Sequence, residues 1–203
     1  MKILGRVRWS RTDSNLLQVL LGAAFAIEVV LGLMLPLIAV AGVGTNPVIQ
    51  RDVEVAGVGT SLVADGPAKL TVSDTARLAI ADADLGQRIL FMLPTIFDTL
   101  LILLGLYWLI LVARTLSAGE PFASRNPSRL FGIAVLIAVG SVGDSLLTAI
   151  TTNRLVAGTT LQGHVPFSLH ISFVPLGIAL LVAALAEAFR VGVQLRRDTE
   201  GLV

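Results

Sequence analysis

The chain of 203 residues contains no cysteine, and only 14% of its residues are charged. The lack of cysteine excludes a disulfide-stapled secreted module, thiolate metal sites and cysteine nucleophiles. The low charge excludes a disordered chain, because disorder requires high charge and low hydrophobicity. A net charge of only +1 gives no reason to expect direct binding to nucleic acid. What the chain has in abundance is apolar residues, at 55%, which is typical of an integral membrane protein.

Four apolar runs are each long enough to cross a bilayer, which takes about 20 residues in a helix. They cover about residues 16–41, 89–112, 130–153 and 171–195. None of them alternates as a barrel strand does, and backbone groups in lipid must be satisfied within each segment. We therefore expect an all-α integral membrane protein, a four-transmembrane-helix bundle that forms a single membrane domain over residues 1–203.

The first run is longer than the apolar region of a signal peptide, which has about 7–15 residues, so we expect an uncleaved helix. Lys and Arg then set the orientation. Ten of them fall in the N-terminal flank, the link between the second and third runs, and the tail, while five are spread over the other two loops. This predicts a multi-pass membrane protein with both termini in the cytoplasm.

The loop at about residues 42–88 is the only connection large enough to fold by itself, and we expect a small β-containing extracytoplasmic lid. Residues 48–58 alternate like a half-buried strand, and residues 70–72 form a second strand candidate. Asp65-Gly66-Pro67 is typical of the turn between them, and residues 75–85 are expected to form a short helix. The lid either senses a ligand or partner outside the cell or is a folded cover with no ligand.

Each predicted span carries one acidic residue, and a charge at mid-bilayer is costly enough that these residues should face the bundle interior. They are Glu28, Asp98, Asp144 and Glu187. Asp98 and Asp144 lie at the same depth, about 14 Å from the outer surface at 1.5 Å per residue, and could meet there. The pair is either a proton or cation site or a protonated contact that joins helices, since no basic residue is expected at that depth.

Glu187 has a partner within its own helix. Arg190 follows it at i+3, a spacing that favours a structural ion pair. Glu28 has no such local partner, and we expect it to face the bundle.

Motifs for nucleophilic catalysis, phosphate binding and metalloprotease sites do not occur in the sequence. We expect no catalytic residues, no metal site and no cofactor, and therefore not an enzyme.

Two sequence elements on the predicted cytoplasmic side resemble those of one bacterial membrane family. The tail from Ala186 to Val203 follows the pattern A-E-x-F-R-x-G-x-x-L and closes on Leu-Val. Ahead of the third span stand Gly119-Glu120-Pro121-Phe122, Asn126 and Arg129-Leu130. Together they resemble the domain of unknown function 2975 (DUF2975) family. The resemblance implies a four-helix inner-membrane protein of unestablished activity, with relatives expected beside a small helix-turn-helix regulator.

Taken as residues alone, Asn126-Pro127 can begin a helix, and the preceding turn is either a topological element or a docking surface for a cytoplasmic protein. The docking candidates are Glu120, Pro121, Phe122, Asn126 and Arg129. We expect the partners to be the lipid bilayer and a cytoplasmic regulatory protein, with a homo-oligomer also compatible. Two functions remain open: a non-enzymatic regulatory or interaction protein, and a small proton- or cation-coupled transporter or channel that uses the intramembrane carboxylates.

Overall fold

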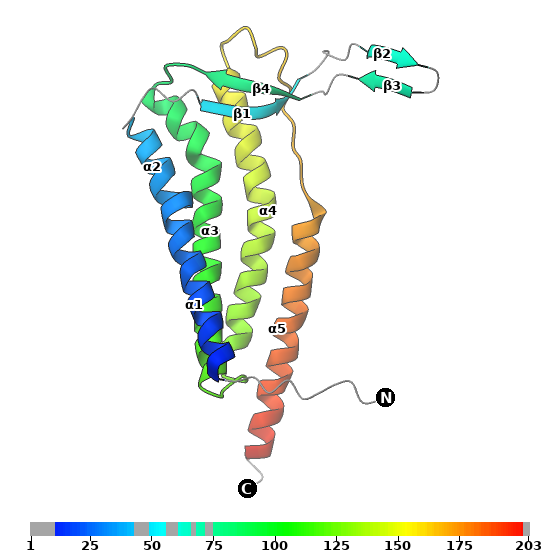
Figure 1. Cartoon of the computed structure of the whole chain (residues 1–203). Helices are drawn as coiled ribbons and strands as arrows, with labels where there is room; N and C mark the ends of the chain where they lie inside the picture. Colours follow the sequence, from blue (N-terminus) through cyan, green and yellow to red (C-terminus); the bar gives the residue numbers. More distant parts are fainter. Residues whose placement is uncertain (1–10, 43–48, 56–60, 66–67, 72–74, 201–203) are drawn as a thin grey trace. The chain divides into compact units, whose positions relative to one another are not determined.

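The structure is a computed structural model that describes residues 11–42, 49–55, 61–65, 68–71 and 75–200. Within these ranges, four helical segments are long and apolar enough to cross a membrane (Figure 1). They are Asn15–Val40, Leu85–Ser117, Asn126–Val156 and Phe173–Thr199. The predicted all-α class with a small β-containing loop is confirmed.

The first segment consists of α1 (Arg11–Glu28), a π-helical stretch η1 (Val29–Met34) and α2 (Leu35–Val40). The other three are α3 (Leu85–Ser117), α4 (Asn126–Val156) and α5 (Phe173–Glu200). Large apolar side chains on these helices are left uncovered by protein, including Leu180 at 73% and Leu181 at 72% exposed. So much exposed apolar surface marks a contact with membrane or protein, and on helices of this length it fits contact with lipid.

Pro36 explains the distorted stretch in the first segment. Proline has no N–H, so the carbonyl of Gly32, four residues earlier, receives no helical hydrogen bond from it. The Thr99 hydroxyl donates to that Gly32 carbonyl at 2.9 Å, and Thr99 is only 2% exposed. A side chain from α3 thus supplies a donor to a carbonyl that Pro36 cannot serve, one way in which membrane helices accommodate proline.

Two antiparallel strand pairs occur within the described residues. β1 (Ile49–Glu54) pairs with β4 (Thr75–Ile80), and β2 (Ser61–Asp65) pairs with β3 (Ala68–Thr71). The predicted pairing of the first strand with residues 70–72 is therefore wrong, because Leu70 and Thr71 pair with β2, while residue 72 lies outside the described residues. The predicted turn residues Gly66 and Pro67 lie outside the described residues.

The helix predicted at residues 75–85 is also wrong, since residues 75–80 form strand β4. β4 alternates: Leu78 is buried beside Val53, while Arg77 on the other face pairs with Asp52 at 3.1 Å. Asp82 then takes a positive φ of 52°. α3 begins only after Asp84, which exchanges hydrogen bonds with Gln87 in a reciprocal cap.

The chain forms two compact units, and each is described by itself. The first comprises Met1–Leu33, Asp98–Ser141 and Ser172–Val203, and the second comprises Met34–Phe97 and Val142–Ile171. In the second unit, Val53 and Leu78 from the strands form a small core with Val156 and Val165, and Ile80 packs against it. The single-domain organisation remains a prediction.

Candidate functional site

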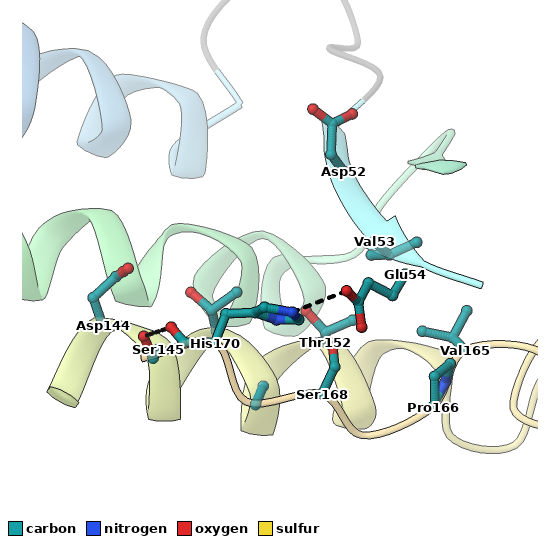
Figure 2. Close-up of a pocket in the computed structure, with 12 residues that line it drawn as sticks. Asp52, Val53, Glu54, Asp144, Ser145, Thr152, Val165, Pro166, Ser168 and His170 are labelled. Carbon is teal, nitrogen blue, oxygen red and sulfur yellow. Dashed lines mark hydrogen bonds and ion pairs between the residues drawn. The ribbon is translucent and has the colours of Figure 1, made fainter. Parts of the chain in front are cut away.

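The second unit contains a pocket of about 200 Å³ where strand β1, the C-terminal half of α4 and the following loop come together (Figure 2). Its walls carry carboxylates, hydroxyls and an imidazole. The lining residues are Asp52, Val53, Glu54, Asp144, Ser145, Thr148, Ala149, Thr152, Val165, Pro166, Ser168 and His170. Because three separate segments build it, the pocket exists only when the strand rests on the helix.

His170 is held at two points on the pocket wall. Its Nε2 lies 2.9 Å from Glu54 Oε1, and its backbone carbonyl accepts a hydrogen bond from the Ser145 hydroxyl, as Figure 2 shows. The loop after α4 is therefore tied both to β1 and to α4. Both Glu54 and His170 remain accessible to solvent, with 41% and 71% of their side chains exposed.

Arg51 joins strand β1 to two transmembrane helices. Its Nη1 donates to the hydroxyls of Thr151 at 2.9 Å and Thr152 at 3.0 Å in α4. Its Nη2 donates to the Phe91 carbonyl of α3 at 2.6 Å, and the guanidinium lies 4.7 Å from the centroid of the Phe91 ring. Thr151 is 1% and Thr152 9% exposed, and buried hydroxyls are normally hydrogen-bonded, so the guanidinium provides both with a donor inside the protein.

Burial lowers the pKa of Arg51, while the negative charge of Asp144 acts in the opposite direction and raises that pKa. An arginine stays charged under such shifts, because its pKa lies far above neutral pH. Asp144 therefore has a permanent cation in its surroundings, supplied by the loop that precedes α3. Arg51 itself bonds to α4 at Thr151 and Thr152, about two helical turns beyond Asp144, and the expectation that no basic residue lies at the depth of Asp144 stays a prediction.

Sequence reasoning missed the contacts of Arg51, because in the sequence this arginine is one of several charged residues in the loops. A signal was present, however: in a strand, residues two apart share a face, so Arg51 lies on the same face as the buried Val53. Neither its target helices nor its hydrogen-bond partners could be read from that pattern.

The other predicted carboxylates lie in the first unit. Asp98 Oδ1 lies 3.9 Å from the position that a Gly140 Cβ would occupy, so the carboxylate is close to the α4 backbone. Glu28 Oε1 and Thr99 Oγ1 both lie 2.6 Å from the corresponding point on Gly32. Glu28 thus lies beside the π-helical stretch. Asp98 and Asp144 belong to different units, and their meeting remains a prediction.

Glu187 and Arg190 form a two-pronged ion pair within α5. Arg190 Nη2 lies 2.6 Å from Glu187 Oε1, and Arg190 Nε lies 2.8 Å from Oε2. The arrangement is the one that the i,i+3 spacing predicts.

The docking candidates around the turn that precedes α4 fall into buried and exposed groups. Asn126 is fully buried, and its Nδ2 donates to Thr115 Oγ1 at 2.7 Å and to the Pro121 carbonyl at 3.1 Å. Arg129 Nη1 donates to Asn126 Oδ1 at 3.2 Å and to the Leu111 carbonyl at 3.3 Å. α4 begins at Asn126 as predicted, but the Asn126 side chain ties the turn to α3.

Phe122 joins the turn to α5. Its ring centroid lies 5.8 Å from that of Phe189, and a methyl group on Gly192 would collide with the Phe122 ring. Phe189 and Gly192 belong to the tail motif, and Phe122 belongs to the turn motif, so the two motifs pack against each other. Of the docking candidates, Glu120 and part of Phe122 remain exposed.

Across the described parts of the chain, no three His, Asp or Glu side chains come together in an arrangement that could hold a metal ion. The pocket polar groups instead contact one another through hydrogen bonds and ion pairs. Such a lining can receive a small polar molecule that exchanges partners with them.

Comparison with known proteins gives a single type of match. No curated protein and no solved structure matches the chain. A family model described as "Protein of unknown function (DUF2975)" matches residues 68–203. The matched range contains both interlocked motifs, the turn with Phe122 and the tail with Phe189 and Gly192. This chain therefore belongs to the DUF2975 family.

Proposed function

We propose that this multi-pass membrane protein is a non-enzymatic regulatory protein that binds a small polar molecule in the pocket beside β1. The observation that carries the proposal is the Arg51 contact, which connects the pocket wall to both α3 and α4. Asp52 and Glu54, the first and third residues after that arginine, line the pocket. A molecule that displaces β1 would therefore act directly on the hydrogen bonds between Arg51 and the two helices.

The pocket polar groups favour binding over catalysis. Activation of a serine needs a base within hydrogen-bond reach of its hydroxyl. The Ser145 hydroxyl instead donates to a backbone carbonyl, and the His170 imidazole faces Glu54. These groups are arranged to hold the loop and the strand, not to activate one another.

The proposal places the protein in the bacterial inner membrane with the pocket outside and both termini inside, following the distribution of Lys and Arg. A cytoplasmic protein would then meet the exposed part of the turn that precedes α4, at Glu120 and the edge of Phe122. The buried Asn126 would support that surface without touching the partner.

Site-specific crosslinking tests the proposal. Because the chain has no cysteine, Glu120→Cys creates a unique attachment point for a photo-crosslinker in intact cells. We expect one crosslinked protein, with a yield that Arg51→Gln changes by about fivefold or more, a typical allosteric coupling. The control is Arg154→Gln, which removes an exposed arginine near the end of α4 that does not line the pocket and should leave the yield unchanged. A product whose yield Arg51→Gln does not alter would contradict the proposed link to the pocket.

Proton- or cation-coupled transport is the second candidate. It is favoured by Glu28 beside the π-helical stretch and by Asp98 against Gly140, because carboxylates within membrane segments often mark ion paths. The nearby Arg51 argues against Asp144 as a proton carrier, since it supplies a fixed countercharge. Proteoliposomes under a pH gradient separate the two candidates. Flux that is lost in an Asp98→Asn, Asp144→Asn double mutant would replace the regulatory proposal with transport.

A further inference from the structure

A groove runs along the first unit between α4 and α5, and its character changes from one end to the other. One part has a volume of about 290 Å³ and is lined entirely by apolar side chains, many of them small. They include Phe131, Ala134, Ala138, Leu176, Ala179 and Ala183. The adjoining part, of about 490 Å³, shares Phe131 and Ala183 and adds Ser128, Glu187 and Arg190. The groove is therefore apolar along most of its length and ends on two opposite charges.

The length of the groove matches one leaflet of a bilayer. From Leu176 to Arg190 it follows fourteen residues of α5, or about 21 Å at 1.5 Å per residue. Half of a bilayer with its headgroups measures about 20–22 Å. A transmembrane helix from a second copy would need a groove across the whole bilayer, whereas one lipid of a single leaflet matches the length of this groove.

The charged end offers both signs to a headgroup. Arg190 uses Nε and Nη2 for Glu187, which leaves three of the five guanidinium N–H groups for a phosphate. Each Glu187 oxygen accepts one bond from Arg190 and retains a lone pair for a further donor. Both side chains are more than half exposed, at 56% for Glu187 and 59% for Arg190. An anion beside Arg190 and a cationic N–H donor beside Glu187 would complete this arrangement.

We propose that the α4–α5 groove is a phospholipid site whose occupant carries a primary ammonium group next to its phosphate, as phosphatidylethanolamine does. One acyl chain lies along the alanine-lined part, the phosphate accepts from Arg190, and the ammonium donates to Glu187. A choline headgroup cannot make the last contact, because its nitrogen carries no hydrogen. A glycerol headgroup lacks the cation. The site is independent of the proposed regulatory function.

Native mass spectrometry of the full chain tests the inference, after release from nanodiscs that contain equal parts of phosphatidylethanolamine, phosphatidylglycerol and phosphatidylcholine. We expect the wild-type chain to retain phosphatidylethanolamine in preference to the other two lipids. Ala183→Phe fills the groove and should reduce the retained lipid about tenfold, a loss of the size that closing a binding site produces. Ala184→Phe is the matched control, because the neighbouring alanine is exposed and does not line the groove, and it should retain the lipid.

Glu187→Gln keeps the shape of the side chain and removes its charge, so it tests the headgroup even if Ala183→Phe fails to fold. Its expected result is a loss of the preference for phosphatidylethanolamine, while total lipid retention falls less. Equal retention of all three lipids by the wild type would overturn the headgroup assignment. Equal retention by Ala183→Phe and Ala184→Phe would overturn the site. A dimer that only Ala183→Phe abolishes would assign the groove to a second copy and overturn the lipid proposal.

Discussion

The two ends of α4 are built in opposite ways. At its beginning, Asn126 bonds to Thr115, only 11 residues away, and is fully buried. At its end, Thr151 receives its hydrogen bond from Arg51, 100 residues away, beside an open pocket. The first end is closed by its own turn and is matched by the family model, whereas β1 precedes the matched residues. Contacts between near neighbours in sequence thus hold the first end, whereas the second end is held by a remote contact beside the pocket of the proposed function.

Removal of the Asn126 side chain should have the largest effect. The Thr115 hydroxyl, the Pro121 carbonyl and the Arg129 guanidinium each lose a hydrogen bond at the closed end. We expect Asn126→Ala to lower the free energy of unfolding by about 3 kcal/mol, since each buried polar group left without a partner costs about 1–3 kcal/mol. Reversible denaturation in detergent micelles measures this change. Asn153→Ala, an exposed asparagine of the same helix, should be nearly neutral, and equal losses for the two variants would contradict the comparison.

Arg51→Gln tests the open end. The variant loses the bonds to Thr151, Thr152 and the Phe91 carbonyl. We expect this loss to lower the free energy of local opening at β1 by about 2 kcal/mol, the value of hydrogen bonds from a charged donor. Hydrogen exchange should accelerate in β1 and β4 while the turn that precedes α4 stays protected. Arg77→Gln provides the control, because an exposed ion pair contributes at most about 1 kcal/mol. Faster exchange throughout the chain would mean that this end is as integral to stability as the closed end.

Gly192→Ala should destabilise the closed end by about 1–2 kcal/mol, because the added methyl group meets the Phe122 ring and overpacking costs about 1–3 kcal/mol. The double variant with Phe122→Leu should recover part of this loss. Gly177→Ala adds the same methyl group where nothing lies within 4 Å, and should stabilise α5 by up to about 1 kcal/mol. Thermal melting in micelles distinguishes these outcomes, and identical melting of both alanine variants would rule out the packing of the two motifs.

His170→Gln should have the smallest effect, because its contact with Glu54 is exposed and such pairs contribute at most about 1 kcal/mol. We expect slightly faster hydrogen exchange at residues 165–170 and unchanged global stability. His164→Gln in the same loop serves as the reference. A global loss of stability on His170→Gln would show that the open end is held more firmly than its geometry indicates.

Sequence reasoning predicted the elements whose determinants are local. Apolar runs placed the four spans, Asn126-Pro127 marked the start of α4, and the spacing of Glu187 and Arg190 predicted their geometry. Strand pairing depends on contacts between distant residues, so the alternation in β4 was read as a helix and β1 was given the wrong partner. The pocket was missed for the same reason, because Arg51 and Thr151 are joined only by the fold.

The hydroxyl of Thr99 has a consequence for how the protein enters the membrane. Until α3 arrives, the Gly32 carbonyl in the first segment lacks the Thr99 donor and cannot receive a bond from Pro36, and an unmet backbone group in hydrocarbon costs several kcal/mol. The first segment thus receives this donor from a hydroxyl that lies 67 residues later in the chain. We therefore expect the first segment and α3 to pack against each other early in membrane insertion.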